Sequence, residues 1–441
     1  MKLLYILNHF LPSQTAGTEI YVWSLAKKMV EDGIEIKIVI PNYNQNVSTD
    51  YIYDGLEVHQ YAEPSVVDRS LIMDFRKPEG LVSFKKYINS EKPDIIHFHG
   101  IAGSNGISIH HISVAKATGA KVLFTFHLAG LSCMTGTLMK NGNSLCDGNI
   151  ELNKCATCYL HSKKVNNYSA HLLTWISRFF NYLSVNPTKL STTIGTALGT
   201  VSLVKQKKED LYKLIEICDK VVVLSNWYKD ILISNGIPQN KIISIPQGLA
   251  SISSVLNMGK KTSNKLKFVF VGRISSFKGL HLLVDAFMQL DKGNAELHIY
   301  GQSDGSDYER TLKEITKSIN TIYWKGLLEQ SEVVKTISEY DALCLTSTTS
   351  EMSPLVIQEA FAAKIPVIAS NVYGNAEHIK HGVNGLLFKF NDRDDLLNQL
   401  ERCINEPNLL AGLASNILTP NSFDTVSKQH LVVYNQLLYS N

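Results

Sequence analysis

The stretch Thr349-Ser-Glu-Met-Ser-Pro-Leu-Val-Ile-Gln-Glu-Ala-Phe-Ala-Ala-Lys-Ile-Pro-Val-Ile-Ala-Ser370 predicts a helix followed directly by a buried strand. Ser353 and Pro354 suit the N-cap and the first helical position, because proline has no N–H group to leave unpaired there. The helix is expected to continue to about Ala363, and the apolar run Pro366-Val-Ile-Ala-Ser370 comes next as the strand. A helix and a strand in this succession indicate an α/β fold.

The start of this helix is a candidate anion-binding site. Its first turn leaves the N–H groups of Leu355 and Val356 unpaired, and the helix dipole adds partial positive charge there. Phosphate is the most natural ligand for such a terminus. Glu359 lies on the same helix face, and Glu351 lies in the loop just before the helix. Carboxylates on either side of a phosphate site suit a nucleotide sugar, which has hydroxyl groups on both sides of its diphosphate.

Length and composition place the chain among folded proteins of two domains. It has 441 residues, which exceeds the usual size of a single core, and 44% of them are hydrophobic against 19% charged. The 43 basic and 40 acidic residues nearly balance, so bulk charge does not favour a nucleic-acid-binding protein. The apolar start of the chain is too short for a signal peptide, and no run approaches the roughly twenty apolar residues that span a bilayer. We therefore expect a cytoplasmic protein with reduced cysteines.

Alternating strands and helices predict two doubly wound, Rossmann-like α/β domains. The first is expected over residues 1–250, with a cysteine-containing insertion at about 131–206. A segment rich in Ser, Asn, Gly and Lys at 251–265 is interpreted as the linker, 266–422 as the second domain, and 423–441 as a C-terminal helix. The expected strands are 3–7, 34–40, 94–98, 121–126, 220–224 and 242–245 in the first domain, and 267–272, 296–300, 322–324, 342–345 and 366–370 in the second.

Two cations come after the first strand of the second domain, in Gly272-Arg-Ile-Ser-Ser-Phe-Lys-Gly279. Arg273 offers a planar fork and Lys278 a point charge, which together suit a diphosphate at the carboxyl edge of a strand. An Arg/Lys pair alone is more often a solvated surface pair. Its place at the start of a βα unit, in the same domain as Glu351 and Glu359, favours the binding role.

These motifs resemble the retaining family 4 glycosyltransferases of GT-B fold, also described as glycosyl transferases group 1. The resemblance rests on Arg273, Lys278, Glu351 and Glu359, and on Gly17-Thr-Glu19, Phe124-Thr-Phe-His127, Gly374-Asn-Ala-Glu377 and Gly382-Val-Asn-Gly385. It covers nearly the whole chain in the right order, and its second-domain part is the more specific. It implies two Rossmann-like domains facing a cleft, with the C-terminal helix crossing back to the first domain.

The resemblance implies roles for the charged residues of the second domain. Arg273 and Lys278 would contact the diphosphate of a nucleotide-sugar donor. Glu359 would bind the ribose hydroxyls, and Glu351 would contact the transferred sugar. Either glutamate alone is more often a carboxylate on a helix surface. The four residues as a set favour the donor site.

The same resemblance implies roles for backbone groups and for the first domain. The backbone of Met352, Ser353 and Leu355 would lie near the phosphate and the sugar. Gly17, in the loop after the first strand, would let the backbone approach the donor closely. His127 would hydrogen-bond the sugar. A lone histidine is more often a structural residue, but its place at the end of a strand favours the sugar-binding role.

The chain departs from the family pattern in two places. It has Ala16-Gly17 where the family often has two glycines, and Gln247-Gly-Leu-Ala250 carries no carboxylate at position 250. Both departures bear on the hinge and the acceptor side. No Asp-x-Asp comes after a strand of the first domain, and Arg273 and Lys278 can stabilise a leaving diphosphate directly. We therefore expect no cofactor to be required for the chemistry.

The insertion contains the four cysteines Cys133, Cys146, Cys155 and Cys158. The last two, in Cys155-Ala-Thr-Cys158, have the close spacing of a zinc knuckle. A structural Zn²⁺ held by four thiolates is one interpretation. Four reduced thiols in a loop, or disulfides in a less reducing setting, are the others.

The segment His171-Leu-Leu-Thr-Trp-Ile-Ser-Arg-Phe-Phe-Asn-Tyr-Leu183 is rich in aromatic residues, and Lys163, Lys164 and Arg178 lie near it. A helix lying in a membrane interface has this composition. A helix packed on the first domain has a similar one, and the sequence favours that alternative slightly. If the acceptor is lipid-linked, this segment is where peripheral contact with the inner face of the membrane is expected.

The sequence thus predicts a retaining glycosyltransferase that moves a sugar from a UDP- or GDP-sugar to an acceptor hydroxyl. The acceptor is expected to be a glycan or a lipid-linked molecule, in cell-surface polysaccharide or glycolipid assembly. A sugar-nucleotide epimerase, a phosphorylase on the same fold and a catalytically silent nucleotide-sugar binder are the alternatives. An NAD(P)-dependent oxidoreductase would need Gly-x-Gly-x-x-Gly after the first strand, which Asn8-His-Phe-Leu-Pro-Ser-Gln-Thr-Ala-Gly17 lacks.

Overall fold

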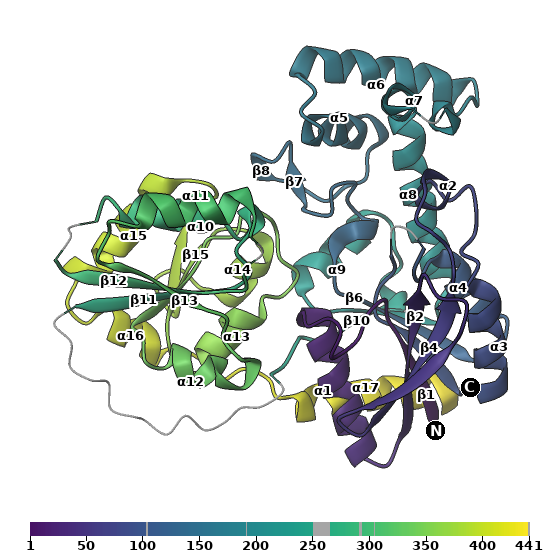
Figure 1. The fold of residues 1–441 in the computed structure, drawn as a ribbon, viewed down its shortest axis with the longest axis horizontal. Coiled ribbons are helices and arrows are strands. Elements are labelled where there is room, and N and C mark those ends of the chain that lie inside the picture. The colour runs from purple at the N-terminus through teal and green to yellow at the C-terminus, as the bar shows by residue number, and fades with distance from the viewer. Residues whose placement is uncertain (103–104, 191, 250–264, 291–292, 304, 440–441) are drawn as a thin grey trace. The chain divides into compact units, whose positions relative to one another are not determined.

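The computed structural model describes residues 1–102, 105–190, 192–249, 265–290, 293–303 and 305–439. The chain divides into two compact units, whose elements are labelled in Figure 1. Met1–Asn141, Cys146–Ala250 and Phe423–Asn441 make up the first unit, and Ser251–Ser422 with Gly142–Leu145 make up the second. The linker predicted at 251–265 lies outside the described residues, except for its last residue.

The first unit is built on an eight-stranded sheet in the order β10-β9-β6-β5-β1-β2-β4-β3. Neighbouring strands are parallel, apart from the antiparallel pair β3 and β4. The six strands predicted for this domain are confirmed, and the order reverses between β1 and β5. The strands are β1 (Lys2–Ile6), β2 (Glu35–Tyr43), β3 (Thr49–Tyr53), β4 (Leu56–Glu63), β5 (Ile95–Phe98), β6 (Lys121–Phe126), β9 (Lys220–Val223) and β10 (Ile242–Ser244).

The hairpin of β3 and β4 is absent from the sequence-based prediction. Its two-residue turn is Asp54-Gly55, and both residues have positive φ, 47° and 80°. An Asp-Gly pair between strand-forming residues is the usual signal for such a turn. The sequence therefore carried the evidence for this edge hairpin.

The first helix of the chain includes the glycine that the resemblance assigns to a loop. α1 begins at Gly17, and its first hydrogen bond runs from the N–H of Ile20 to the carbonyl of Ala16. Gly17 therefore lies in the first turn of a helix and not in the preceding loop. The helices are α1 (Gly17–Glu31), α2 (Arg69–Ile72), α3 (Leu81–Glu91), α4 (Ile109–Lys116), α5 (Leu152–Ser162), α6 (Asn167–Tyr182), α7 (Thr193–Leu198), α8 (Thr200–Ile217), α9 (Asn226–Ser234) and α17 (Phe423–Tyr439).

The C-terminal helix α17 belongs to the first unit, as the resemblance implies. Two of its buried side chains hydrogen-bond to groups far away in the sequence. The Tyr434 hydroxyl lies 3.0 Å from the hydroxyl of Tyr5 on β1 and 2.8 Å from Nδ1 of His97 on β5. Nε2 of His430 lies 2.8 Å from the hydroxyl of Tyr21 on α1. These buried bonds connect the end of the chain to its first strand and first helix.

Helices α5, α6, α7 and α8 form the helical part of the insertion, where α6 packs against the other three. Figure 1 shows α5 and α6 running beside each other, and the short hairpin of β7 (Met139–Lys140) and β8 (Ser144–Leu145) precedes them in the chain. None of the helices in the described ranges is long and apolar enough to cross a membrane.

The second unit contains a six-stranded parallel sheet in the order β13-β12-β11-β14-β15-β16. Its strands are β11 (Leu266–Val271), β12 (Ala295–Tyr300), β13 (Ile322–Gly326), β14 (Ala342–Leu345), β15 (Val367–Ser370) and β16 (Gly385–Phe388). Successive residues of β11 alternate between two cores, with Phe268 and Phe270 in one and Val269 in the other. Both faces of the sheet are therefore covered, as a doubly wound fold requires.

The strands predicted for the second unit are confirmed up to β15, but the prediction omits the elements of this unit that come after that strand. The omitted elements are α14, β16, α15 and α16. Residues Gln330–Glu332 form a 3₁₀ turn directly ahead of α12. The helices are α10 (Leu280–Phe287), α11 (Asp307–Thr316), α12 (Val333–Ile337), α13 (Leu355–Ala362), α14 (Tyr373–His378), α15 (Arg393–Asn405) and α16 (Leu409–Ser415).

Candidate functional site

The candidate site of the second unit lies where its strand order reverses, between β11 and β14. Ligands of open α/β sheets bind at such a point, beyond the carboxyl ends of the strands. The loop after β11 carries Arg273 and Lys278, and the loop after β14 carries Glu351. The sequence thus delivers both cations and one carboxylate to the same edge of the sheet.

Backbone contacts hold these two loops together. Gly279 has a φ of 65°, and a Cβ atom there would collide with the carbonyl oxygen of Thr346. The Thr346 hydroxyl donates to the carbonyls of Lys278 and Gly279, at 3.1 and 2.9 Å. The N–H group of Thr348 donates to the carbonyl of Phe277 at 2.9 Å. Only glycine fits at position 279 without strain, so the loop after β11 is held at a fixed distance from the loop after β14.

Lys278 and Glu351 form an ion pair within this site. Nζ of Lys278 lies 2.7 Å from both carboxylate oxygens of Glu351, and the Ser347 hydroxyl donates to one of them. Burial opposes ionisation of Glu351, but the charge and hydrogen bond of Lys278, the bond from Ser347 and the charge of Arg273 outweigh it. The pKa of Glu351 therefore falls below its usual value. Glu351 is a carboxylate at neutral pH.

Arg273 is exposed at the same edge. Its guanidinium makes no hydrogen bond or ion pair with any residue that the structure describes. Its charge still lowers the pKa of Glu351. An exposed guanidinium beside an existing Lys–Glu pair is a strong donor group available to an anionic ligand.

The helix α13 starts one residue later than the sequence predicts. Pro354 has extended backbone angles and is the N-cap, and Leu355 is the first helical residue. The Ser353 hydroxyl lies 3.1 Å from Nε2 of His378 on α14, so it is not the helix cap. No hydrogen bond from the described residues occupies the N–H groups of Leu355 and Val356. The unpaired helix terminus predicted from the sequence is therefore present, with a different cap, and anion binding there stays a prediction.

The backbone before α13 is fixed by contacts with α14. A Cβ atom on Gly374 would collide with the carbonyl oxygen of Glu351, so the first turn of α14 lies directly against that backbone. Asn375 of the same helix donates to the carbonyl of Ser370 at 3.0 Å, and Ser370 donates to the carbonyl of Ser347 at 2.7 Å. Met352 is nearly buried beside these groups, with 8% of its surface exposed.

Glu359, on α13, is almost fully buried and is hydrogen-bonded. Nε2 of Gln330 donates to its Oε1 atom at 2.6 Å. Burial raises the pKa of Glu359 to about 7, although the bond from Gln330 lowers it in part. Gln330 belongs to the turn after β13, and no motif in the sequence identifies it. The site therefore contains one carboxylate that is ionised at neutral pH and a second that is half protonated there.

The site residues predicted for the first unit lie at the carboxyl edge of its sheet. His127 comes after β6 and His99 after β5, and Nε2 of His127 shares a hydrogen bond of 3.2 Å with Nδ1 of His99. Burial lowers the pKa of His127 to about 3, so its ring is neutral. Its Nδ1 atom is not hydrogen-bonded to any residue in the described ranges. Gly17 is exposed at the start of α1.

The four cysteines of the insertion each make a separate contact. The Cys133 thiol lies 3.3 Å from the Thr135 hydroxyl, and Sγ of Cys158 accepts from the N–H of Asn141 at 3.2 Å. Burial raises the pKa of Cys155 to about 11, and neighbouring thiols add to the rise. Among the residues that the structure describes, no three His, Cys, Asp or Glu side chains converge closely enough to hold a metal ion. The zinc site stays a prediction.

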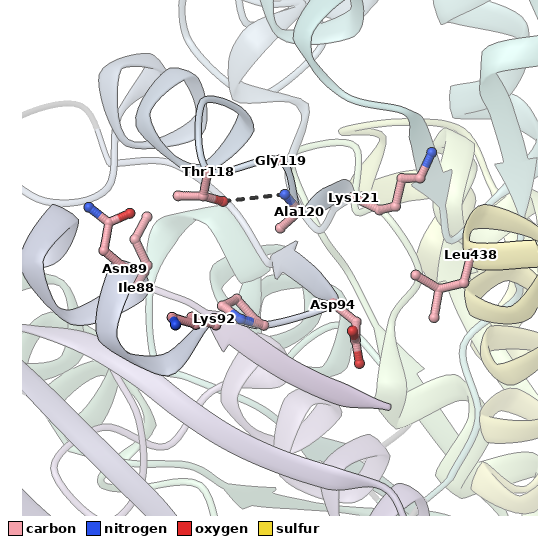
Figure 2. Close-up of a pocket in the computed structure, with 10 residues that line it drawn as sticks. Ile88, Asn89, Lys92, Asp94, Thr118, Gly119, Ala120, Lys121 and Leu438 are labelled. Carbon is pink, nitrogen blue, oxygen red and sulfur yellow. Dashed lines mark hydrogen bonds between the residues drawn. The ribbon is translucent and has the colours of Figure 1, made fainter.

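A surface cavity of about 600 Å³ lies elsewhere in the first unit (Figure 2). It is lined by Asp94 and Lys121, at the amino ends of β5 and β6, and by Leu438 of α17. Parallel sheets bind ligands at the opposite, carboxyl ends of their strands. The cavity therefore lies at the other edge of the sheet from His99 and His127.

Comparison with known proteins gives matches in both units. The family model described as glycosyl transferases group 1 matches residues 257–417, and the model described as Glycosyltransferase Family 4 matches residues 15–180. An uncharacterized glycosyltransferase of Methanocaldococcus jannaschii is 21% identical over 98% of both chains. The lipopolysaccharide 1,6-galactosyltransferase of Salmonella typhimurium is 30% identical over 43% of this chain and 54% of its own. Several curated relatives, this one included, match over only about half of their own length.

Solved structures of the same fold cover the whole chain. The Anabaena protein HepE, solved in complex with UDP and glucose, matches with a TM-score of 0.64 and 15% identity, covering 99% of this chain and 100% of its own. At this identity the match establishes the fold alone. Both halves of this chain follow the GT-B architecture that the sequence predicts.

Proposed function

We propose that this glycosyltransferase moves a sugar from a nucleoside-diphosphate sugar to an acceptor hydroxyl, with retention of configuration, and the match of residues 257–417 to the group 1 model supports the proposal. One observation carries the donor assignment. Arg273 has no hydrogen-bond or ion-pair partner among the described residues. It lies at the same sheet edge as the Lys278–Glu351 pair and the start of α13, whose first N–H groups are unpaired within the described residues. Three kinds of anion-binding group thus occur at one edge of one sheet.

The diphosphate of the donor is proposed to bind between Arg273 and the start of α13. The guanidinium can form two parallel hydrogen bonds with phosphate oxygens, and the N–H groups of Leu355 and Val356 can form two more. The ammonium group of Lys278 can contact a phosphate oxygen while its ion pair with Glu351 keeps that carboxyl group ionised. These contacts strengthen as charge builds up on the leaving diphosphate, so they favour the transition state over the bound substrate.

Glu359 is proposed to bind the ribose hydroxyls of the nucleoside. An ionised carboxylate accepts two hydroxyl hydrogen bonds, and Gln330 already fixes the position of one of its oxygens. Glu351 is proposed to accept hydrogen bonds from the hydroxyls of the transferred sugar. Its two oxygens are held by Lys278 and Ser347, which set the direction of the carboxylate. His127, with a free Nδ1 atom, is proposed to hydrogen-bond the sugar as well.

The reaction is proposed to proceed on one face of the sugar. The bond between the anomeric carbon and the diphosphate oxygen breaks, and the acceptor oxygen forms its bond to the same carbon. The acceptor proton passes to the departing diphosphate, which leaves as the nucleoside diphosphate. Retention follows because the new bond forms on the side from which the leaving group departs. The resemblance to retaining family 4 enzymes supports this route.

The acceptor is proposed to be a glycan or a lipid-linked molecule in surface polysaccharide assembly. The relative in Salmonella typhimurium that is named for lipopolysaccharide galactose transfer supports this class. The HepE structure, which holds UDP and glucose, supports a UDP-sugar as the first donor to test.

A thermal-shift panel of UDP-, GDP- and ADP-sugars tests the donor assignment. A ligand at a hundred times its dissociation constant stabilises the folded protein by about 2.7 kcal/mol. We expect one nucleotide class to raise the melting temperature of the wild type, and Arg273→Ala to remove that rise. Arg393→Ala, an exposed arginine of the same unit, is the matched control and should keep it. A rise that Arg273→Ala leaves unchanged would place the donor elsewhere.

Product analysis separates the transferase from its alternatives. A transferase releases nucleoside diphosphate only together with a glycosylated acceptor. Isomerisation of the donor without acceptor would indicate an epimerase, and dependence on inorganic phosphate would indicate a phosphorylase. NMR of the anomeric proton of the product, recorded early in the reaction, gives the configuration of the new glycosidic bond. A configuration inverted relative to the donor sugar would refute retention.

A further inference from the structure

Helix α6 has five exposed large apolar side chains, whereas its fully buried residues are small. The face that packs on α5 and α8 contains the buried residues Ala170, Thr174 and Ser177. The Thr174 hydroxyl bonds with that of Thr157 at 2.9 Å, and the Ser177 hydroxyl accepts from the N–H of Val201 at 2.9 Å. The helix thus packs within the first unit, as the slightly favoured alternative expects, but its fully buried residues are small and not aromatic.

The opposite face carries a continuous apolar stripe. Tyr168, Leu172, Trp175, Phe179 and Tyr182 succeed each other at spacings of three and four residues, which places them on one side of a helix. Trp175 is 68% exposed, Phe179 55% and Tyr182 82%. Exposed apolar residues scattered singly are common on soluble proteins, but a row of five along one helix face indicates a contact surface.

The charged side chains near this stripe are mostly basic, although Glu151 lies beside Arg178 and Tyr182 at its end. Residues 155–204 contain four basic residues, Lys163, Lys164, Arg178 and Lys189, and no Asp or Glu. All four are exposed. The whole chain has nearly equal numbers of acidic and basic residues, so this segment departs from it. A partner surface that matches it must accept aromatic rings and supply negative charge.

We propose that this aromatic–basic surface, made of the five stripe residues and the four cations, docks on a bilayer leaflet that contains anionic lipids. Trp and Tyr rings favour the headgroup level of a bilayer, and nearby Lys and Arg attract anionic headgroups. A second copy of the chain is a poorer occupant, because a symmetric contact would bring like charges together. Docking would keep the enzyme beside an acceptor held in the lipid. That consequence rests on the proposed function, whereas the docking itself does not.

Vesicle flotation tests the docking without any sugar substrate. We expect the full-length protein to float with vesicles that contain about one-third phosphatidylglycerol in phosphatidylcholine, and not with phosphatidylcholine alone. High salt should release much of it. Changing Lys163 and Lys164 together to alanine should weaken binding about tenfold or more, because each cation near an anionic surface contributes about fivefold. Equal binding to both vesicle types would overturn the proposal.

A double substitution tests the aromatic part, with a matched control. Trp175→Ala with Phe179→Ala should remove most of the binding, whereas Ile52→Ala with Val82→Ala should leave it unchanged. The control residues are exposed and apolar in the same unit, outside the stripe. Unchanged melting temperatures establish that both variants are folded. Wild-type binding by the aromatic variant would refute the docking surface.

The fluorescence of Trp175 gives a direct reading of insertion. Of the four tryptophans, Trp175 is exposed and the other three are at least partly buried. Lipids with bromine on the acyl chain should quench part of the emission in bound wild type, and Trp175→Phe should still bind but lose that quenching. Absence of quenching in bound wild type would contradict insertion. Light scattering without lipid measures whether the protein self-associates. Self-association of the wild type that is lost in the aromatic variant would show that the surface binds a second copy of the chain and would overturn the proposal.

Discussion

Replacing Glu359 by glutamine distinguishes the effect of this buried carboxylate on the stability of the fold from its proposed effect on donor binding. Glutamine has the same shape and can still accept the hydrogen bond from Gln330. It has no charge at any pH. The wild-type carboxyl group has its pKa raised to about 7 by burial, against an ordinary value of 4.5. Only the wild type is therefore destabilised by ionising a buried group as the pH rises.

The direction and size of the stability effect follow from this shift. A carboxyl group with a raised pKa in the folded state contributes stability that is fully present below its unfolded pKa and is lost as the pH rises through 7. The difference of 2.5 pKa units between 4.5 and 7 corresponds to about 3 kcal/mol. We expect Glu359→Gln to gain up to about 3 kcal/mol of stability over the wild type between pH 4 and pH 8.

Donor binding should change in the opposite direction. If only the ionised carboxylate accepts the ribose hydroxyls, the binding-competent fraction of wild type rises from about one-tenth at pH 6 to nine-tenths at pH 8. The affinity of the wild type for its donor should therefore increase about tenfold over this range. Glu359→Gln should bind the donor weakly, without that dependence on pH.

Chemical denaturation and calorimetric titration at several pH values measure the two effects. Buried histidines such as His127 and His430, with pKa values lowered to about 3, destabilise the protein as the pH falls below about 6.5. The quantity to compare is therefore the difference between variant and wild type at each pH. Glu401→Gln, an exposed glutamate of the same unit, is the control and should give no such difference. A constant difference from pH 4 to pH 8 would refute the raised pKa.

Three further experiments test other parts of the structure. Lys278→Met should lower the free energy of unfolding by about 1–2 kcal/mol, because Glu351 loses its partner at a partly exposed site, and calorimetry should show donor affinity at least tenfold weaker. Gly279→Ala should cost about 2 kcal/mol or more through its positive φ and the collision with Thr346, whereas Gly412→Ala, with open space around it in α16, should gain up to about 1 kcal/mol in the same denaturation assay. Zinc analysis of protein purified without chelator should find about one ion per chain if the four cysteines of the insertion bind it, and its absence would refute that prediction.

The convergence of the charged residues in the second unit was predictable because they occupy fixed places in a repeating pattern. Arg273 and Lys278 come after one strand, and Glu351 comes after the strand that lies beside it in the sheet. Parallel strands bring the loops after them to a common edge, so proximity followed from the order of elements. The place of each predicted strand in the sequence followed from its apolar run.

Contacts between elements without a motif were beyond prediction. Gln330 reaches Glu359 from a turn that no pattern marks, and Ser353 bonds to His378 instead of capping α13. The sequence also did not determine which face of α6 is buried, because an amphipathic pattern distinguishes two faces and does not say which one packs on the protein. There the small residues Ala170 and Ser177 permit close packing, and that packing decided the orientation.

The bonds of α17 to the first strand and first helix bear on the order in which the chain can fold during synthesis. Tyr434 and His430 leave the ribosome after every residue of the second unit. The buried hydroxyls of Tyr5 and Tyr21 therefore have no partner on α17 while the second unit is being made. A domain whose sequence is continuous can fold as soon as it has emerged. The half of the protein that is begun first is consequently the half that is completed last, and a chain whose synthesis stops before residue 423 has a first unit that lacks the α17 partners of Tyr5 and Tyr21.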